Sequence, residues 1–572
     1  MILVERAGSQ LKLTHDFMLE EIVHLRALPV RRFDPGTKAW MAAPTAANKR
    51  HLNTLAPNVV VQWTPEAVSL FEERHAKAVD EAVIAFPPGF CFVTKSRPYQ
   101  LEALQLMQEA PAFALSLPPG SGKTKIYLED MEVQVLRGAI DGALFMCPNS
   151  IKKNLSDERE IHAFMEFDTE IYSPTKKAKI RQWIQTPSTK PKLLVMATET
   201  LSSGDGFDIA SEFLKTGQKG LYLDESSRVK THKAERTKMA IKLGGLAVVK
   251  RIGTGTMILK GLVDAWAQYQ VLSPDIFGQS FYAFRNRYAK MGGYKAKQVT
   301  GDMNVDEFME VVRPFTYCRL KADILPDLPE KVPVTRTVEM SKEQKRLYTE
   351  LKNSGLTLTE EGSVSFTTAL VRELRLQQIT GGFIGGELIG NDQDGLHYKK
   401  EASAIPGPNP KIDEVEAILD DMEGKVVIWA RFIPEIRALA ERLRKKGINC
   451  VTFTGQGMTD EEREASKVAF RDDPDVRCFI GQSRTGGIGL NGLTVAQVAI
   501  YLSNDFSLET RIQSEDRTHR IGQDGMTLPG DDHKSVLYID ILTEGGNDND
   551  IYQALRAGKD YTAIINERMK AC

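Results

Sequence analysis

The sequence predicts two α/β lobes, each a doubly wound parallel sheet, with helical protrusions and a small N-terminal α+β domain. Three observations predict this class. With 572 residues, the chain is too long for one hydrophobic core. Short apolar runs alternate with helix-like stretches in two separate parts of the chain, which is typical of parallel sheets with helices on both faces. The linker Ile405-Pro-Gly-Pro-Asn-Pro410 divides these two parts.

Residues 1–88 alternate short β-like runs with amphipathic helices, and we expect a separate α+β accessory domain there. Short β-like runs, two of them joined by the turn Pro35-Gly36, predict strands at 2–4, 11–13, 30–34, 38–42 and 59–63. Helices are expected at 16–27, at 46–55 and after Thr64-Pro65. Phe86-Pro-Pro-Gly89 then ends the pattern as a linker.

The two lobes are predicted at residues 89–260 and 406–572. Strands of the first lobe are expected at 112–117, 142–147, 192–197, 220–223 and 247–253, with a helix at 125–136. Strands of the second lobe are expected at 425–429, 449–453, 476–480, 498–502 and 536–541. Residues 261–405 lose the alternation and become helical and basic, which indicates a protrusion region and linker.

Composition excludes several classes of protein. The formal charge of -2 gives no global sign of a polyanionic partner, so a nucleic-acid surface would have to come from local basic clusters. The six cysteines lie far apart without a C-x-x-C pair, which argues against a zinc ribbon and a disulfide framework. No stretch approaches the roughly 18 apolar residues of a membrane span. We therefore expect a cytoplasmic protein, nuclear in a eukaryote, with no membrane partner.

A phosphate-binding loop lies between the first predicted strand of the first lobe and the helix that follows it. Residues 116–124 read Ser-Leu-Pro-Pro-Gly-Ser-Gly-Lys-Thr, so backbone N–H groups, a lysine and a helix N-terminus face one point. Lys123 would hold the β- and γ-phosphates, and Thr124 would hold Mg²⁺. The residues expected to contact the nucleotide are Pro119, Gly120, Ser121, Gly122, Lys123 and Thr124.

A carboxylate pair supplies what this loop lacks. The apolar run Gly220-Leu-Tyr-Leu ends in Asp224-Glu225. Asp224 offers Mg²⁺ a hard oxygen ligand, and Glu225 can orient the attacking water. The two motifs together predict a nucleoside triphosphatase, although the loop alone also fits a kinase, a GTPase or a ring ATPase.

The order and spacing of further motifs resemble the Swi/Snf family of superfamily-two helicase-like ATPases, whose lobes are RecA-like. Arg97-Pro-Tyr-Gln100 resembles the adenine-reading Q-type motif, Asp224-Glu-Ser-Ser227 the DEAH-like motif, and Thr254-Gly-Thr256 the coupling motif. Thr485-Gly-Gly-Ile-Gly-Leu-Asn491 and Gln513-Ser-Glu-Asp-Arg-Thr-His-Arg-Ile-Gly-Gln523 resemble the fifth and sixth motifs.

This resemblance implies roles for single residues. Arg517 and Arg520 would be the arginine fingers that stabilise charge on the transferred phosphoryl group. Gln513 and Asp516 would orient that pair or contact the ribose, and Arg97 and Gln100 would contact adenine. Taken alone, two arginines in a polar helix are ordinary surface ion-pair residues.

Nucleic-acid contacts follow from the same resemblance. Lys152 and Asn154 resemble motif Ia, Thr198 motif Ib, and the DNA-contacting set is completed by Thr254, Arg484 and Thr485. Hydroxyls, N–H groups and lysines suit phosphates and give sequence-independent binding. Solvated charge on helix faces stays an equal alternative for any single lysine. Residues 315–321 and 328–331 resemble the family's helical protrusion segments.

The N-terminal domain resembles the accessory module of HARP-type annealing helicases over residues 28–40. Arg32 and Trp40 would contact DNA, because an aromatic ring beside arginines can stack on unpaired bases. The alternative is that Trp40 and Phe33, at alternating strand positions, are core residues.

The sequence therefore predicts an ATP- and Mg²⁺-dependent, monomeric translocase on double-stranded or branched DNA, acting in annealing, fork regression or branch migration. The alternatives are an ATP-driven remodeller that displaces proteins from DNA, and an ATP-switched DNA clamp with little turnover. Ser227, Met257 and Gly492 depart from the family pattern. The first two lie where hydrolysis couples to movement, so ATP hydrolysis follows from the sequence more directly than translocation.

Overall fold

The computed structural model divides into two compact units, Met1–Pro118 with Gly122–Ile324, and Leu325–Cys572 with Pro119–Ser121. The residues that the structure describes are 1–7, 10–15, 25, 31–34, 36–42, 52, 59–68, 86–92, 94–149, 152, 167–202, 205–255, 257–258, 261–292, 298–325, 328–354, 366–385, 388–392, 395–398, 402–486, 492–520, 526–527 and 534–561. Among these residues, none of the helices has the length and apolar character needed to cross a bilayer.

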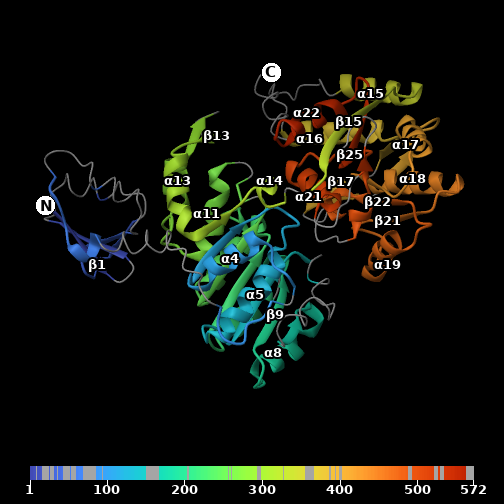
Figure 1. Ribbon diagram of the computed structural model, residues 1–572. Helices are drawn as coiled ribbons and strands as arrows, with labels where there is room; N and C mark the ends of the chain where they lie inside the picture. Colours follow the sequence, from blue (N-terminus) through green and yellow to red (C-terminus); the bar gives the residue numbers. More distant parts are fainter. Residues whose placement is uncertain are drawn as a thin grey trace. The chain divides into compact units, whose positions relative to one another are not determined.

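The N-terminal domain contains a five-stranded sheet (blue in Figure 1) in the order β3-β4-β2-β1-β5. Its strands are β1 (Ile2–Ala7), β2 (Gln10–His15), β3 (Arg31–Asp34), β4 (Ala39–Ala42) and β5 (Val61–Trp63). Only β1 and β5 run parallel; the other pairs are antiparallel. Apolar side chains alternate along β1 and β2 and form a buried core. The strands confirm the prediction, whereas the helices expected at 16–27 and 46–55 lie outside the described residues apart from Leu25 and Leu52.

The first lobe is a seven-stranded sheet in the order β14-β6-β11-β10-β7-β9-β8, and every pair is parallel. Its strands are β6 (Ala112–Ser116), β7 (Gly142–Cys147), β8 (Asp168–Ile171), β9 (Lys192–Ala197), β10 (Lys219–Asp224), β11 (Val249–Thr254) and β14 (Thr316–Cys318). The five predicted strands all form, within two residues of their expected ends. These strands have near-continuous apolar runs because helices cover both faces of the sheet.

Helices cover both faces of this sheet (Figure 1). The core on one face contains residues of α8 (Lys177–Gln185), α9 (Gly206–Leu214), α10 (Glu235–Gly244) and α11 (Ala265–Leu272), packed on strand residues such as Leu144 and Leu223. The strand residues between these, among them Phe145 and Tyr222, face Tyr127 of α5 (Lys123–Leu136). Next to α5 lies α4 (Pro98–Gln108).

A helical insertion lies between β11 and β14 of the first sheet, within the residues where helical protrusions were expected. It comprises α12 (Phe281–Tyr288), the antiparallel hairpin β12 (Ala289–Gly292) and β13 (Gln298–Asp302), and α13 (Val305–Val312). Phe277, Phe284, Tyr288 and Phe308 form its aromatic core. Glu307 accepts hydrogen bonds from Arg287 and from the Tyr288 hydroxyl at 2.6 Å, which ties α13 to α12.

The second lobe is also a parallel sheet, in the order β15-β25-β23-β20-β22-β21, with β24 (Met526–Thr527) antiparallel to β25. Its parallel strands are β15 (Glu330–Val338), β20 (Val426–Ala430), β21 (Cys450–Phe453), β22 (Cys478–Gln482), β23 (Val498–Tyr501) and β25 (Lys534–Thr543). One face packs on α17 (Pro410–Asp421) and α18 (Ile433–Lys445). The other packs on α19 (Asp460–Asp472) and α21 (Leu508–Thr518).

Residues 261–405 contain more strands than expected, including the antiparallel pairs of β16 (Phe383–Gly385) with β19 (Ala402–Ala404) and of β17 (Leu388–Asp392) with β18 (Gly395–Tyr398). They were expected to be helical, yet β14 joins the first sheet beside β6, and β15 joins the second sheet beside β25. In β15 the sequence Glu-Lys-Val-Pro-Val-Thr-Arg-Thr-Val has valines at alternate positions, the period of a half-buried strand. Pro333 obscures this signal, and an edge strand tolerates it because one side of the strand needs no ladder hydrogen bond.

A buried ion pair joins four elements of the first lobe. Arg251 of β11 and Asp130 of α5 are both fully buried, with Nε and Oδ2 2.8 Å apart. The Tyr222 hydroxyl of β10 donates to the same carboxylate, and the Arg251 guanidinium also donates to the carbonyls of Met107 and Ala110 at the end of α4. Charges removed from water need this degree of pairing, because an unpaired buried charge is costly.

We predict that Arg251→Met lowers the free energy of unfolding of the full chain by about 3–5 kcal/mol, because it leaves Asp130 as an uncompensated buried charge. The matched control is Arg137→Met, which removes a surface ion pair with Glu109 and is expected to cost less than about 1 kcal/mol. Urea unfolding of both variants measures the difference. Equal losses would contradict the structural importance of the buried pair.

Candidate nucleotide-binding site

Three predicted motifs meet at one edge of the first sheet. The phosphate-binding loop follows β6, the Thr254 motif ends β11, and Asp224-Glu225 ends β10; these three strands are neighbours in the order β6-β11-β10. Ser116 pairs with Thr254, and Asp224 pairs with Gly253. Because parallel strands all end at the same edge, motifs that are far apart in sequence become adjacent there.

The phosphate-binding loop depends on two glycines. Gly120 and Gly122 have φ angles of 79°, in the left-handed region that favours glycine. Gly122 is the N-cap of α5, so the N-terminus of that helix opens directly onto the loop. The Lys123 ammonium donates to the carbonyls of Leu117 and Pro118, at 3.0 and 3.4 Å. Thr124 is the second residue of the helix.

The Q-type motif lies against the phosphate-binding loop. Arg97 is the N-cap of α4, and its backbone N–H donates to Gln100 Oε1 at 3.0 Å. A Cβ atom added at Gly122 would lie 2.6 Å from Gln100 Nε2, which is too close for a real contact. The Gln100 amide can therefore approach the loop this closely only because residue 122 is a glycine. The structure therefore brings Gln100 and the loop together, while adenine contact by Arg97 and Gln100 stays a prediction.

The carboxylate motif is held in a strained conformation. Glu225 has φ 52° and ψ 54°, a left-handed conformation that is unfavourable for a residue with a side chain. Its N–H donates to Asp224 Oδ1 at 3.0 Å, and its Oε2 accepts from the Thr254 hydroxyl at 3.1 Å. Thr254, which the sequence assigned to DNA, thus contacts the carboxylate expected to orient water.

Tyr127 of α5 lies beneath this motif. Its hydroxyl lies so close to β11 that a Cβ at Gly253 would meet it at 1.9 Å, which explains a glycine in this buried strand. Burial first, and then the negative charges of Asp224 and Glu225, raise the pKa of Tyr127 well above its usual value. Tyr127 is therefore a neutral support for the carboxylate edge.

The residues predicted to bind DNA in the first lobe are engaged within it. Lys152 Nζ donates to the Tyr172 carbonyl at 3.1 Å, and burial lowers its pKa. Thr198 is fully buried, with its hydroxyl 3.4 Å from the Cys147 carbonyl. Both lie at the carboxyl ends of β7 and β9, as expected. Asn154 lies outside the described residues.

The other predicted DNA contacts lie in separate parts of the fold. Arg484 and Thr485 are in the short helix α20 (Ser483–Gly486) directly after β22, and the Thr485 hydroxyl donates to Gln482 Oε1 at 3.2 Å. Trp40 in β4 is partly buried and packs against the N-terminal core. That packing favours the interpretation of Trp40 as a core residue. Arg32 is in β3, and only its backbone is described.

The first six residues of the sixth motif, 513–518, form the C-terminal half of helix α21 of the second lobe. On its buried side the hydroxyls of Ser514 and Thr518 contact those of Tyr501 and Tyr538 at 2.8 and 2.9 Å. Arg511 forms two hydrogen bonds with the buried Asp540 of β25, at 2.5 and 2.9 Å. The remaining side carries Gln513 and Arg517, four residues apart and half-buried, and Arg520 follows the helix end.

The same helix is attached to the edge strand β15. Lys331 Nζ lies 2.9 Å from Glu515 Oε2 and 3.6 Å from Asp516 Oδ1. His519 Nε2 lies 2.6 Å from the carbonyl oxygen of Pro329, just before that strand. Burial opposes ionisation of Glu515, but Lys331 and Arg511 outweigh it and lower its pKa to about 2. Two cations thus hold Glu515 as a carboxylate.

Sequence reasoning missed several residues that support the site. Arg251 and Asp130 were predicted only as parts of a strand and a helix. Lys331 was placed only in a segment resembling a helical protrusion, and Arg511 received no assignment. A charged residue inside an apolar strand, as in Val249-Lys-Arg-Ile252, is a usable signal, because such a charge needs a buried partner. The partner itself cannot be read from one sequence.

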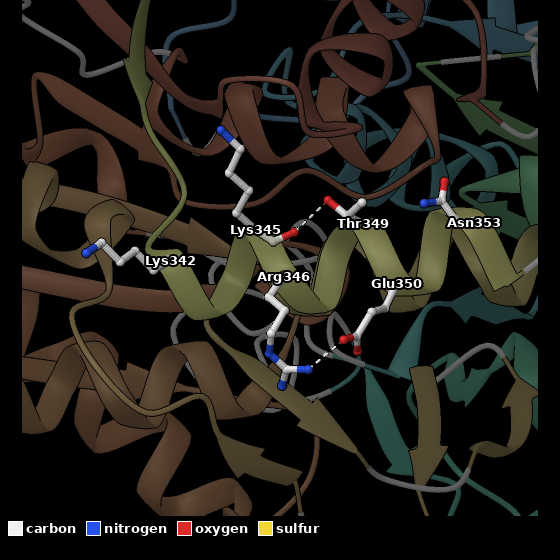
Figure 2. A pocket seen from close by; sticks show the side chains of 6 residues that line it. All are labelled: Lys342, Lys345, Arg346, Thr349, Glu350 and Asn353. Carbon is white, nitrogen blue, oxygen red and sulfur yellow. Dashed lines mark hydrogen bonds and ion pairs between the residues drawn. The ribbon is translucent and has the colours of Figure 1, made fainter.

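None of the residues that line the hollow shown in Figure 2 belongs to these motifs. It has a volume of about 470 Å³ and runs along helix α15 (Lys342–Ser354), which supplies all of its lining residues. In Figure 2 Arg346 reaches Glu350, at 2.6 Å, and the Thr349 hydroxyl reaches the Lys345 carbonyl. A hollow lined by one exposed helix offers no set of groups converging on a ligand. Its lining residues are Lys342, Lys345, Arg346, Thr349, Glu350 and Asn353.

Two parallel-sheet RecA-like lobes, one with a P-loop motif beside a carboxylate pair, define the fold of a helicase-like P-loop protein. The SNF2-related domain family matches residues 48–381, more than half of the chain, and the helicase conserved C-terminal domain matches residues 410–522. The chain therefore belongs to the SNF2-related family. This confirms the resemblance to Swi/Snf proteins, while the HARP-type assignment of the N-terminal domain stays a prediction.

Similar curated proteins are longer than this chain. An uncharacterized ATP-dependent helicase, MG018, of Mycoplasma genitalium is 24% identical over 67% of this chain and 34% of its own length. The ATP-dependent DNA helicase DDM1 of Arabidopsis thaliana is 24% identical over 53% of this chain and 41% of its own. The chain thus spans about a third to two fifths of the length of these relatives. The Sulfolobus solfataricus SWI2/SNF2 ATPase core in complex with dsDNA is 20% identical, with a TM-score of 0.38, over 82% of this chain and 93% of that one.

We predict that Glu515→Gln lowers the free energy of unfolding at pH 7 by about 3 kcal/mol at most, because a pKa of about 2 instead of 4.5 corresponds to roughly that stabilisation. The depressed pKa means that the stabilisation is fully present above pH 4.5 and is lost as the pH falls toward 2. Urea unfolding at several pH values measures it. If the free energy of unfolding depended on pH identically in the variant and the unmodified protein between pH 4.5 and 2, the lowered pKa of Glu515 would be contradicted.

Proposed function

We propose that this protein hydrolyses ATP and uses the energy to translocate along double-stranded or branched DNA. The observation that carries the proposal is the shared edge of β6, β11 and β10, where the phosphate-binding loop, Thr254 and the Asp224-Glu225 pair are adjacent. A loop that binds phosphates, next to carboxylates that bind metal and orient water, is suited to phosphoryl transfer to water.

The donor groups at this edge fit Mg²⁺. The Thr124 hydroxyl and the Asp224 carboxylate are hard oxygen ligands, and Mg²⁺ is commonly held by one or two such groups together with substrate phosphates. When bound, Mg²⁺ neutralises charge on the β- and γ-phosphates. The described residues contain no cluster of three or more His, Cys, Asp or Glu able to hold a metal by themselves, so we expect the metal to bind with the nucleotide.

The remaining roles are assigned to this chain's own residues. Lys123 would exchange the Leu117 and Pro118 carbonyls for phosphate oxygens. Glu225, oriented by the Thr254 hydroxyl, would position the attacking water. Arg517 and Arg520, supplied by the second lobe, would stabilise the charge that develops on the transferred group. Gln513 and Asp516 would orient this pair or contact the ribose.

DNA is proposed as the substrate because the relative DDM1 of Arabidopsis thaliana is named an ATP-dependent DNA helicase. The carboxyl ends of β7, β9 and β22, with Thr198 and Arg484, are the proposed contacts. We further propose annealing, fork regression or branch migration as the output. Other relatives, among them a human SWI/SNF-related regulator of chromatin, favour the remodelling of protein-bound DNA as the second candidate.

We predict that Lys123→Ala and Glu225→Gln each lower ATP turnover by at least about 100-fold, because each removes a group that acts on the transferred phosphoryl or on the water. Steady-state phosphate release measures the effect. The matched control is Lys445→Ala, which removes an exposed ion pair with Glu441 in α18 and leaves turnover unchanged. Turnover that survives in both variants would exclude hydrolysis at this site, whereas little turnover by the unmodified protein would favour the ATP-switched clamp.

The same assay separates the substrates. Duplex or four-way DNA is expected to stimulate turnover at a stated salt concentration, since phosphate contacts weaken as salt rises. Equal stimulation by RNA would overturn the choice of DNA. Regression of a model fork, compared with displacement of a DNA-bound protein, distinguishes the two candidate outputs.

A further inference from the structure

A single buried amide connects the carboxylate motif at residues 224–227 with the segment that follows Thr254. Gln268 lies in α11 and is fully buried. Its Oε1 accepts a hydrogen bond of 2.7 Å from the Ser226 hydroxyl, and its Nε2 donates to the carbonyls of Met257 and Asp264, each at 2.9 Å. Both ends of the amide are therefore used within the first lobe.

The partners of Gln268 belong to different motifs. Ser226 directly follows the strained Glu225 and begins a short 3-10 helix, Ser226–Val229. Met257 follows Thr254, whose hydroxyl donates to the Glu225 carboxylate. Glu225 is thus held from two directions, by Thr254 at its carboxylate and through Ser226 at its backbone, and Gln268 joins both segments.

This link occurs where the sequence departs from the family pattern, at Ser227 and Met257. Met257 is nearly buried and offers its backbone carbonyl to Gln268, while Ser227 is nearly buried beside Ser226. A left-handed conformation at a residue with a side chain persists only where neighbouring contacts hold it. The Ser226–Gln268 hydrogen bond is one such contact, located one residue from Glu225.

We propose that Gln268 is a positioning residue for Glu225, and that it holds the carboxylate motif and the Thr254 motif in one fixed relation. The proposal rests on the proposed hydrolysis of ATP at this edge. Gln268 touches neither nucleotide nor metal; it acts through Ser226 and the Met257 carbonyl. Its loss would leave the phosphate-binding loop intact and would misplace the group that orients water.

The test compares two glutamines of the same helix. Gln268→Met removes the link with little change in side-chain volume. Gln270→Met is the matched control, because Gln270 is also buried and donates to one carbonyl, that of Gly278 at 2.9 Å, away from both motifs. Ser226→Ala removes the hydrogen bond between Ser226 and Gln268 with a smaller change in side-chain structure. It provides the test if Gln268→Met does not fold.

We expect kcat to fall at least about tenfold in Gln268→Met, since small displacements of a positioned group are costly, while KM and the affinity for a fluorescent ATP analogue change less than about twofold. Ser226→Ala is expected to lower kcat in the same way, and the double variant to have no lower kcat than Gln268→Met alone. Gln270→Met is expected to melt at a lower temperature but to keep its kcat.

Two outcomes would overturn the proposal. One is a kcat for Gln268→Met and Ser226→Ala equal to that of Gln270→Met. The other is unchanged amide hydrogen exchange in peptides covering residues 224–229 of both variants, where we expect faster exchange than in Gln270→Met. The exchange measurement does not need turnover, so it tests the link even if the unmodified protein fails to hydrolyse ATP, which would refute the proposed function instead.

Discussion

The parallel pairing of β6, β11 and β10 is the constraint on which the first lobe depends. Because these strands run in one direction and in register, the loops after Ser116, Thr254 and Asp224 emerge side by side. A slip of one residue would turn every strand side chain to the opposite face. The buried Arg251–Asp130 pair opposes such a slip, since it fixes β11 to the helix that begins at the phosphate-binding loop.

The second lobe uses charges in the same way. Arg511 and Lys331 attach α21 to the strands β25 and β15. Attachment of one side of the helix fixes the direction in which Gln513 and Arg517 project. In both lobes, therefore, ionised groups that have no chemical role of their own orient the residues assigned to chemistry. Such pairs contribute orientation more than net stability, because desolvation offsets much of their attraction.

Much of the fold followed from the sequence. Strands such as 142–147 and 192–197 were predicted to the residue, because a strand buried on both faces has an uninterrupted apolar run. The edge strands β8, β14 and β15 were missed, since edges are partly exposed and carry polar residues such as Asp168 and Thr316. The predicted DNA contact Lys152 shows a second limit: a lysine after a strand can equally donate to a carbonyl within its own lobe.

The motifs predict a nucleotide site, whereas the hydrogen bonds among its residues could not be predicted from one sequence. Thr254 was predicted to contact DNA, and its hydrogen bond to Glu225 was not predicted. Nothing in the sequence around Gln268 predicted a role for it. The structure shows that its amide forms hydrogen bonds with Ser226 of one motif and with Met257, which follows the other. Contacts of this kind depend on how helices pack across a sheet, which local patterns do not encode.

We propose that the two lobes divide one reaction: the first would supply the groups that bind ATP, and the second would supply Arg517 and Arg520 to stabilise the developing charge. The most direct test measures single-turnover ATP hydrolysis by the variants Arg517→Ala and Arg520→Ala, with their nucleotide affinity measured in parallel. The control variant is Arg442→Ala, which replaces an exposed arginine of α18. The account predicts a loss of about 10³-fold or more in the rate, with affinity within about threefold. Hydrolysis at the unmodified rate in both arginine variants would contradict it.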